Sequence, residues 1–125
     1  MSRRGARRTD RRRAWRHGRW AETLAAGVLL LTGWRILARD WRSPAGEIDI
    51  IARRRHTIAF IEVKTREDIA AAGEAIGARQ QQRIRRAAGL YLARHPALAA
   101  LDARFDAILV LPWRWPVLVR DAWRE

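Results

Sequence analysis

The chain has 125 residues, of which 26 are Lys or Arg and 13 are Asp or Glu, so its formal net charge is +13. This length suits one domain, and 49% hydrophobic residues are too many for a wholly disordered chain. The absence of Cys excludes disulfides, thiolate zinc sites and a Cys nucleophile, and the three His lack metal-binding spacing.

The first segment along the chain is strongly basic. Residues 1–19 hold nine Arg and a single acid, Asp10. They offer little to bury, so we expect a flexible basic arm over residues 1–17 and one folded domain over residues 18–125. Such an arm attracts phosphate backbones without reading their sequence. The alternative is a tail that only keeps the protein in solution.

The next segments predict a helix followed by three strands. Residues 18–32 have helical spacing of apolar residues, and residues 34–42 alternate as a strand. A turn over residues 43–46, a strand over 47–52, a charged turn over 53–56 and a strand over 57–65 follow. The longest run without a polar side chain, residues 25–31, is far below the roughly 18 residues that a membrane span needs. No secretory signal is recognised, so we expect a cytoplasmic protein without a membrane partner.

The remaining segments predict a second helix and one or two further strands. Residues 66–78 are expected to form a loop, and residues 79–94 a helix with Ile84, Ala87, Ala88, Tyr91 and Leu92 facing inward. Strands are expected over residues 103–111 and, more briefly, over 116–120. The order αβββαβ(β) predicts an α/β fold in which helices flank a mixed central sheet.

Acidic residues alternate with Ile and Val on two of the predicted strands. Alternation places Glu47 and Asp49 on one face of their strand and Ile48 and Ile50 on the other. The two strands are joined by a short turn and should pair antiparallel, which brings Asp49 close to Glu62. Two carboxylates that converge at a strand end form a hard oxygen site suited to Mg²⁺ or Mn²⁺. The alternative is a cross-strand ion pair on a half-exposed sheet.

Lys64 shares a face with Glu62 and is the only Lys among 26 basic residues. An exposed surface position would accept Arg equally well. A position that needs a compact ammonium close to a water or a phosphoryl oxygen would not. An ammonium beside a metal site can orient that water or stabilise the charge that develops on the leaving group.

Four segments together resemble the YraN family of small bacterial proteins: Gly18–Ala26, Gly46–Ala52, Phe60–Arg66 and Arg104–Asp106. That family is similar to the PD-(D/E)XK nuclease superfamily and, within it, to archaeal Holliday-junction resolvases. The resemblance implies a restriction-endonuclease-like core. It places Glu22, Asp49, Glu62 and Lys64 on the catalytic positions of these nucleases. It also implies that Asp49, Glu62 and the carbonyl of Val63 hold the metal ion.

Other residues are expected around this site. Arg66 directly follows it and suits a phosphate contact. At the start of the second helix, where the family usually has a Lys, Arg79, Gln80 and Arg83 are expected to contact nucleic acid. Glu47 is expected to support the metal-holding residues or to pair with Arg66 or Arg104. Arg104 and Asp106 are expected to form a structural pair.

The leading hypothesis is therefore a Mg²⁺-dependent endonuclease acting on DNA, most readily on branched or structured DNA. A non-catalytic nucleic-acid-binding protein on a nuclease-like scaffold is the second hypothesis. A small basic protein bound to RNA or the ribosome is a third, and it would need no divalent cation. A homodimer is a further expectation, since resolvases must cut two strands symmetrically.

Overall fold

The computed structural model describes residues 19–65, 78–112 and 114–122. The predicted basic arm and most of the predicted loop after the third strand lie outside these residues. The described chain begins with a helix over residues 19–31, the N-terminal helix. It is followed by β1 (Arg35–Ser43), β2 (Gly46–Arg54), β3 (Thr57–Thr65), α3 (Ala78–Arg94), the 3₁₀ turn η1 (Pro96–Leu98), β4 (Asp102–Val110) and β5 (Val117–Val119). In the described residues no helix is both long and apolar enough to cross a membrane.

The strands form one mixed sheet in the order β1-β2-β3-β4-β5. Only β3 and β4 run parallel, and α3 makes the crossover between them. The other neighbouring strands are antiparallel. This confirms the expected α/β fold with the order αβββαβ and a short fifth strand, and it is consistent with a restriction-endonuclease-like core.

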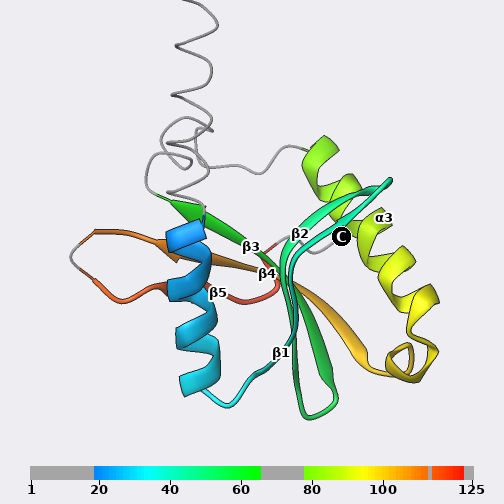
Figure 1. Ribbon diagram of the computed structural model, residues 1–125, viewed down its shortest axis with the longest axis horizontal. Helices are drawn as coiled ribbons and strands as arrows, with labels where there is room; N and C mark the ends of the chain where they lie inside the picture. The colour runs from blue at the N-terminus through cyan, green and yellow to red at the C-terminus, as the bar shows by residue number, and fades with distance from the viewer. Residues whose placement is uncertain (1–18, 66–77, 113, 123–125) are drawn as a thin grey trace, which may run out of the picture.

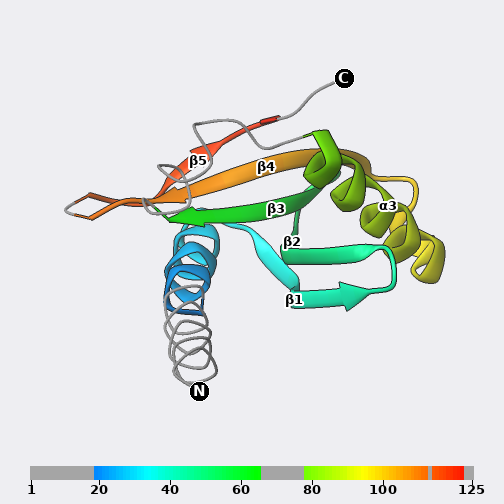
Figure 2. The same ribbon diagram turned by 90° about the horizontal axis from the view of Figure 1, so that it is seen from above.

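Helices cover both faces of the sheet (Figure 2). The helix over residues 19–31 packs through Ala21, Ala25 and Leu29 against one face, and α3 packs against the other. The buried side of α3 consists of Ile84, Ala87, Ala88 and Tyr91, with Leu92 half-buried, as the sequence predicts. Four consecutive β3 residues, 58–61, are buried because both of their faces are covered.

The simple alternation predicted for β2 is wrong at its centre. Ile48 packs in the cluster under α3, whereas Ile50 packs in the cluster under the N-terminal helix. The change of side coincides with a left-handed backbone on the neighbouring strand, where Asp40 of β1 has φ 49°. Trp41, the next residue, is paired with Ile48 and packs in the same cluster. Asp49 therefore lies between two neighbours, Ile48 and Ile50, that pack on opposite faces of the sheet.

The turn between β1 and β2 lies against α3 (Figure 1). The hydroxyl of Ser43 closes the turn by donating to the carbonyl of Gly46 at 2.9 Å. Gly46 has φ +151°, and a Cβ built on it would lie 3.3 Å from the backbone oxygen of Arg83. A glycine is therefore required here both by backbone conformation and by the close approach of the helix.

We expect Gly46→Ala to lower the melting temperature of the protein by roughly 5–15 °C, which corresponds to about 1–3 kcal/mol for strain and crowding of this kind. The matched control is Gly89→Ala on α3, where an added Cβ meets nothing within 4 Å. That control should raise the melting temperature slightly, because Ala favours a helix interior over Gly. A Gly46→Ala protein that melts like the wild type would show that α3 does not approach this turn closely.

A buried ion pair anchors the end of the described chain to β4. Asp106 is fully buried and accepts two-pronged hydrogen bonds from Arg104 at 2.8–3.1 Å. It also accepts the backbone N–H of Asp121 at 2.8 Å. The guanidinium of Arg104 lies 5.4 Å from the ring centroid of Trp34, which is itself buried. The expected structural pair of Arg104 and Asp106 is therefore confirmed.

Candidate active site

The candidate site lies where β2 separates from β3. The antiparallel ladder between these strands ends at the pair Ile50 and Ile61. At the next position, Oδ2 of Asp49 accepts the backbone N–H of Val63 at 2.8 Å. The carboxylate of Asp49 thus takes the place of a backbone carbonyl as the acceptor for Val63. It is held where β2 and β3 begin to separate.

Glu62 occupies the centre of the site. Its Oε1 lies 3.2 Å from Nζ of Lys64 and accepts a long hydrogen bond from the Gln80 amide on α3 at 3.4 Å. The side chains of Glu62 and Lys64 are only 12% and 19% exposed. The second oxygen, Oε2, is buried and has no hydrogen-bond partner among the residues that the structure describes. A buried carboxylate oxygen without a donor is costly unless a cation or an ordered water satisfies it.

Asp49 is electrostatically strained in the absence of a cation. Burial raises the pKa of its carboxyl group to about 7, and the hydrogen bond from Val63 only partly opposes this effect. The negative charges of Glu62, Glu22 and Asp40 raise the pKa further. A cation between Asp49 and Glu62 would relieve this repulsion.

Glu22 reaches the site from the N-terminal helix. Burial raises the pKa of its carboxyl group, and Arg39 opposes the rise through an ion pair of 3.4 Å. Arg39 also donates to the hydroxyl of Thr23 at 3.0 Å, which ties β1 to the helix. The charge of Glu22 influences Asp49, so the two carboxyl groups belong to one electrostatic cluster.

The metal-holding capacity of the site rests on two carboxylates. In the part of the chain that the structure describes, no three His, Asp or Glu side chains come close enough together to hold a metal ion. Glu22 is therefore a neighbour of Asp49 and Glu62 and not a third ligand in this geometry. Mg²⁺ typically uses only one or two protein carboxylates and keeps several waters. The pair, with a Glu62 Oε2 that has no partner in the described part of the chain, fits this ion.

The other predicted residues are placed as follows. Glu47 is exposed and pairs with Arg42 at 3.7 Å. From the sequence, it was expected to support the metal-holding residues or to pair with Arg66 or Arg104. Arg79 and Arg83 are exposed on the first turns of α3, and half-buried Gln80 faces Glu62 between them. Arg66 lies outside the described residues.

Sequence reasoning missed two contributors on β1. Arg39 binds Glu22, and Asp40 raises the pKa of both Glu22 and Asp49. Both residues sit in an Arg-rich strand, where alternation alone gives no signal that distinguishes a site residue from a surface residue.

Comparison with known proteins gives one family, and the match covers the whole candidate site. The profile described as "Uncharacterised protein family UPF0102" matches residues 21–110, a range that includes every described site residue. A UPF0102 protein of Parvibaculum lavamentivorans is 50% identical over 111 residues, which cover 89% of this chain and 84% of that protein. One of Mesorhizobium japonicum is 49% identical, covering 90% of each chain. One of Methylorubrum extorquens is 54% identical, covering 85% of this chain and 84% of that protein.

Proposed function

The chain belongs to the protein family UPF0102, and from that premise we propose that it is a Mg²⁺- or Mn²⁺-dependent nuclease that hydrolyses phosphodiester bonds in DNA. The observation that carries the proposal is the half-buried pair of Asp49 and Glu62, in which one Glu62 oxygen has no partner among the described residues while the other contacts the only Lys of the chain. The resemblance of these positions to those of PD-(D/E)XK nucleases supports the same assignment.

The residues of the site have different proposed roles. Asp49, Glu62 and the carbonyl of Val63 would hold the metal ion. When bound, Mg²⁺ supplies Lewis-acid stabilisation of the phosphate charge and lowers the pKa of a water. Lys64 is held by its 3.2 Å contact with Glu62. From that position its ammonium group would orient the attacking water or donate to a phosphoryl oxygen.

Two further residues position this machinery. Gln80 donates to the same Glu62 oxygen that contacts Lys64, so it limits rotation of the carboxylate. Glu22 keeps negative potential beside Asp49, which favours the cation-bound form of the site. The exposed Arg79 and Arg83 on α3 lie on either side of Gln80 in the sequence and would contact the phosphate backbone.

A preference for branched DNA and the role of the basic arm are parts of the same proposal. The net charge of +13 favours association with a polyanion, and such association weakens as salt rises. We propose that the arm over residues 1–17 adds affinity without sequence preference. We further propose that the protein acts in the cytoplasm, where its DNA substrate would be present.

The second candidate function is nucleic-acid binding without cleavage on the same scaffold. It is favoured by the lack of a third carboxylate close to Asp49 and Glu62 among the described residues. A carboxyl group with a pKa near 7 is also partly protonated at neutral pH, which weakens cation binding. The two functions differ in whether DNA strands are broken.

The test is cleavage of end-labelled linear, flapped and four-way-junction DNA with Mg²⁺, with Mn²⁺ and with EDTA. We expect nicks only with a divalent cation and a loss of cleavage by at least about a hundredfold in Asp49→Asn. Glu47→Gln is the matched control, because it removes an exposed acid two residues away. Binding without nicks under all conditions would support the second candidate and overturn the first.

A further inference from the structure

Arg39 starts from a position of the sheet directly beside the two acids of the candidate site. On β1 it is paired with Ile50 of β2, which in turn is paired with Ile61 of β3. Asp49 precedes Ile50 in the chain, and Glu62 follows Ile61. Because neighbouring strands here are antiparallel, both acids lie on the same side of this row of three residues. Arg39 is therefore the basic residue of β1 that belongs to the row next to the site.

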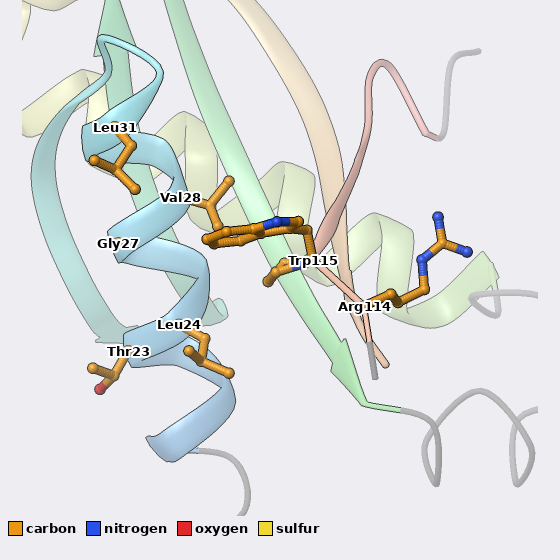
Figure 3. A pocket seen from close by; sticks show the side chains of 8 residues that line it. Thr23, Leu24, Gly27, Val28, Leu31, Arg114 and Trp115 are labelled. Carbon is orange, nitrogen blue, oxygen red and sulfur yellow. The ribbon is translucent and has the colours of Figure 1, made fainter. Parts of the chain in front are cut away.

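The side chain of Arg39 reaches the N-terminal helix, where it contacts Glu22. Its Nε lies 3.4 Å from Oε1 of Glu22, and its Nη2 donates to the hydroxyl of Thr23 at 3.0 Å. Figure 3 shows the side chain of Thr23 pointing away from Trp115. The Thr23 hydroxyl thus fixes the guanidinium in the position from which it neutralises Glu22.

The contact between Arg39 and Glu22 is weak enough to be exchanged for another. It is a long contact of 3.4 Å, whereas the buried pair of Arg104 and Asp106 is joined by two-pronged hydrogen bonds of 2.8–3.1 Å. The Arg39 side chain is 40% exposed, but that of Glu22 is only 13% exposed. Water can solvate a released guanidinium, while a carboxylate that stays largely buried needs another positive partner.

We infer that Arg39 competes with the divalent cation for Glu22, and that this competition sets how tightly the site binds the cation. In the cation-free protein Arg39 neutralises Glu22. When a cation binds at Asp49 and Glu62, Glu22 turns from Arg39 to the waters that the cation retains, and the guanidinium moves into solvent. Arg39 is thus a positioning residue that acts through Glu22. The inference rests on the cation site of the proposed function and adds a means of regulating it.

Two observations support this exchange of partners. The charge of Glu22 already raises the pKa of Asp49, so Glu22 lies within electrostatic reach of a cation bound there. Glu22 nevertheless does not complete a group of three acids that could hold a metal ion in the described part of the chain. Its contact with Arg39 accounts for both facts, because it leaves the carboxylate near the site but directed to another cation.

The alternative is a purely structural role, in which Arg39 only links β1 to the helix. Calorimetric titration of the full chain with Mn²⁺ at about pH 8, without DNA, separates the two roles. Arg39→Gln removes the competing charge, and Thr23→Val loosens the guanidinium without changing the net charge. Arg35→Gln is the matched control, because it makes the same charge change at an exposed position of β1 that is paired with Arg53, at the far end of β2.

Glu22→Gln and the double variant Glu22→Gln/Arg39→Gln complete a double-mutant cycle. We expect Arg39→Gln to bind Mn²⁺ at least about threefold more tightly than the wild type, and Thr23→Val to show a smaller gain in the same direction. Arg35→Gln should bind like the wild type. In the Glu22→Gln background the exchange of Arg39 should leave the affinity for Mn²⁺ unchanged. Circular dichroism and melting in EDTA confirm that each variant is folded.

A structural role predicts that Arg39→Gln melts at a lower temperature but binds Mn²⁺ like the wild type, and that result overturns the inference. An equal gain in Arg35→Gln, or a gain that persists without Glu22, overturns it as well, as does a wild type that binds no Mn²⁺. The expected pattern of affinities without any DNA cleavage would refute the nuclease proposal alone. Cleavage by a protein whose Arg39→Gln variant has wild-type Mn²⁺ affinity would refute this inference alone.

Discussion

Lys64→Arg should lose about a hundredfold in DNA cleavage rate while folding, metal response and DNA affinity stay close to those of the wild type. Nζ of Lys64 lies 3.2 Å from Glu62, and its side chain is largely buried, so the ammonium group has little freedom. A guanidinium on a longer stem keeps the charge but places its donors about 1 Å or more away, and misplacement of that size costs on the order of a hundredfold in rate. Single-turnover cleavage in Mg²⁺ measures the effect.

An exchange of Arg for Lys at an exposed position provides the control for Lys64→Arg. Arg55→Lys lies in an exposed turn and should leave every measurement unchanged. Under the alternative of a simple cross-strand ion pair, Arg would pair with Glu62 at least as well as Lys does. Wild-type turnover by Lys64→Arg would therefore remove Lys64 from the catalytic machinery.

Asp49→Asn should abolish the stabilisation of the protein by Mg²⁺ and change how its stability depends on pH. In the wild type, a ligand of the folded state raises the melting temperature by mass action. The proton and the cation compete for Asp49, whose pKa is about 7 in the fold. The Mg²⁺-induced shift should therefore be small at pH 6 and fully developed above pH 8. Thermal melts with Mg²⁺ and with EDTA at each pH measure it.

Without metal, the stability that Asp49 contributes falls as the pH rises, whereas the stabilisation by Mg²⁺ grows with pH. The folded-state pKa of Asp49 is raised from the usual 3.8 of an aspartate to about 7, so the folded protein holds a proton that the unfolded chain releases. The stability contributed by this group is complete below pH 3.8 and is lost as the pH rises through about 7. In EDTA at pH 8, Asp49→Asn should thus be more stable than the wild type, by on the order of a few kcal/mol. Glu47→Gln should follow the wild type, and equal melting of Asp49→Asn and the wild type under all conditions would refute the site.

The local sequence pattern was sufficient to predict strands and helices that have regular backbone geometry and regularly paired neighbours. The span of β3, the inward side of α3 and the antiparallel pairing of β2 with β3 follow from alternation, helical spacing and a short turn. The side change of β2 between Ile48 and Ile50 could not be predicted in this way. It coincides with the left-handed backbone of Asp40 on the neighbouring strand, which only the tertiary structure reveals.

The candidate site could likewise be predicted from the sequence only in part. Asp49, Glu62 and Lys64 lie on adjacent regular strands, so their proximity follows from sequence spacing together with the family resemblance. The hydrogen bond between Gln80 and Glu62 joins residues 18 positions apart on a helix and a strand. Its existence depends on where α3 crosses the sheet, and that crossing is set by the close approach of Arg83 to Gly46. No local pattern carries such information.

The hydrogen bond from Val63 to Asp49 gives the protein a built-in spectroscopic probe. In the rest of the β2–β3 ladder, backbone amides donate to backbone carbonyls, whose charge does not change with pH. The Val63 amide donates to a carboxylate that titrates near neutrality. Its ¹H and ¹⁵N chemical shifts therefore follow proton loss at Asp49 directly, and a cation that displaces the proton leaves its own signature on the same resonance. One backbone signal thus reports the charge state of the candidate site without any substitution in the site itself.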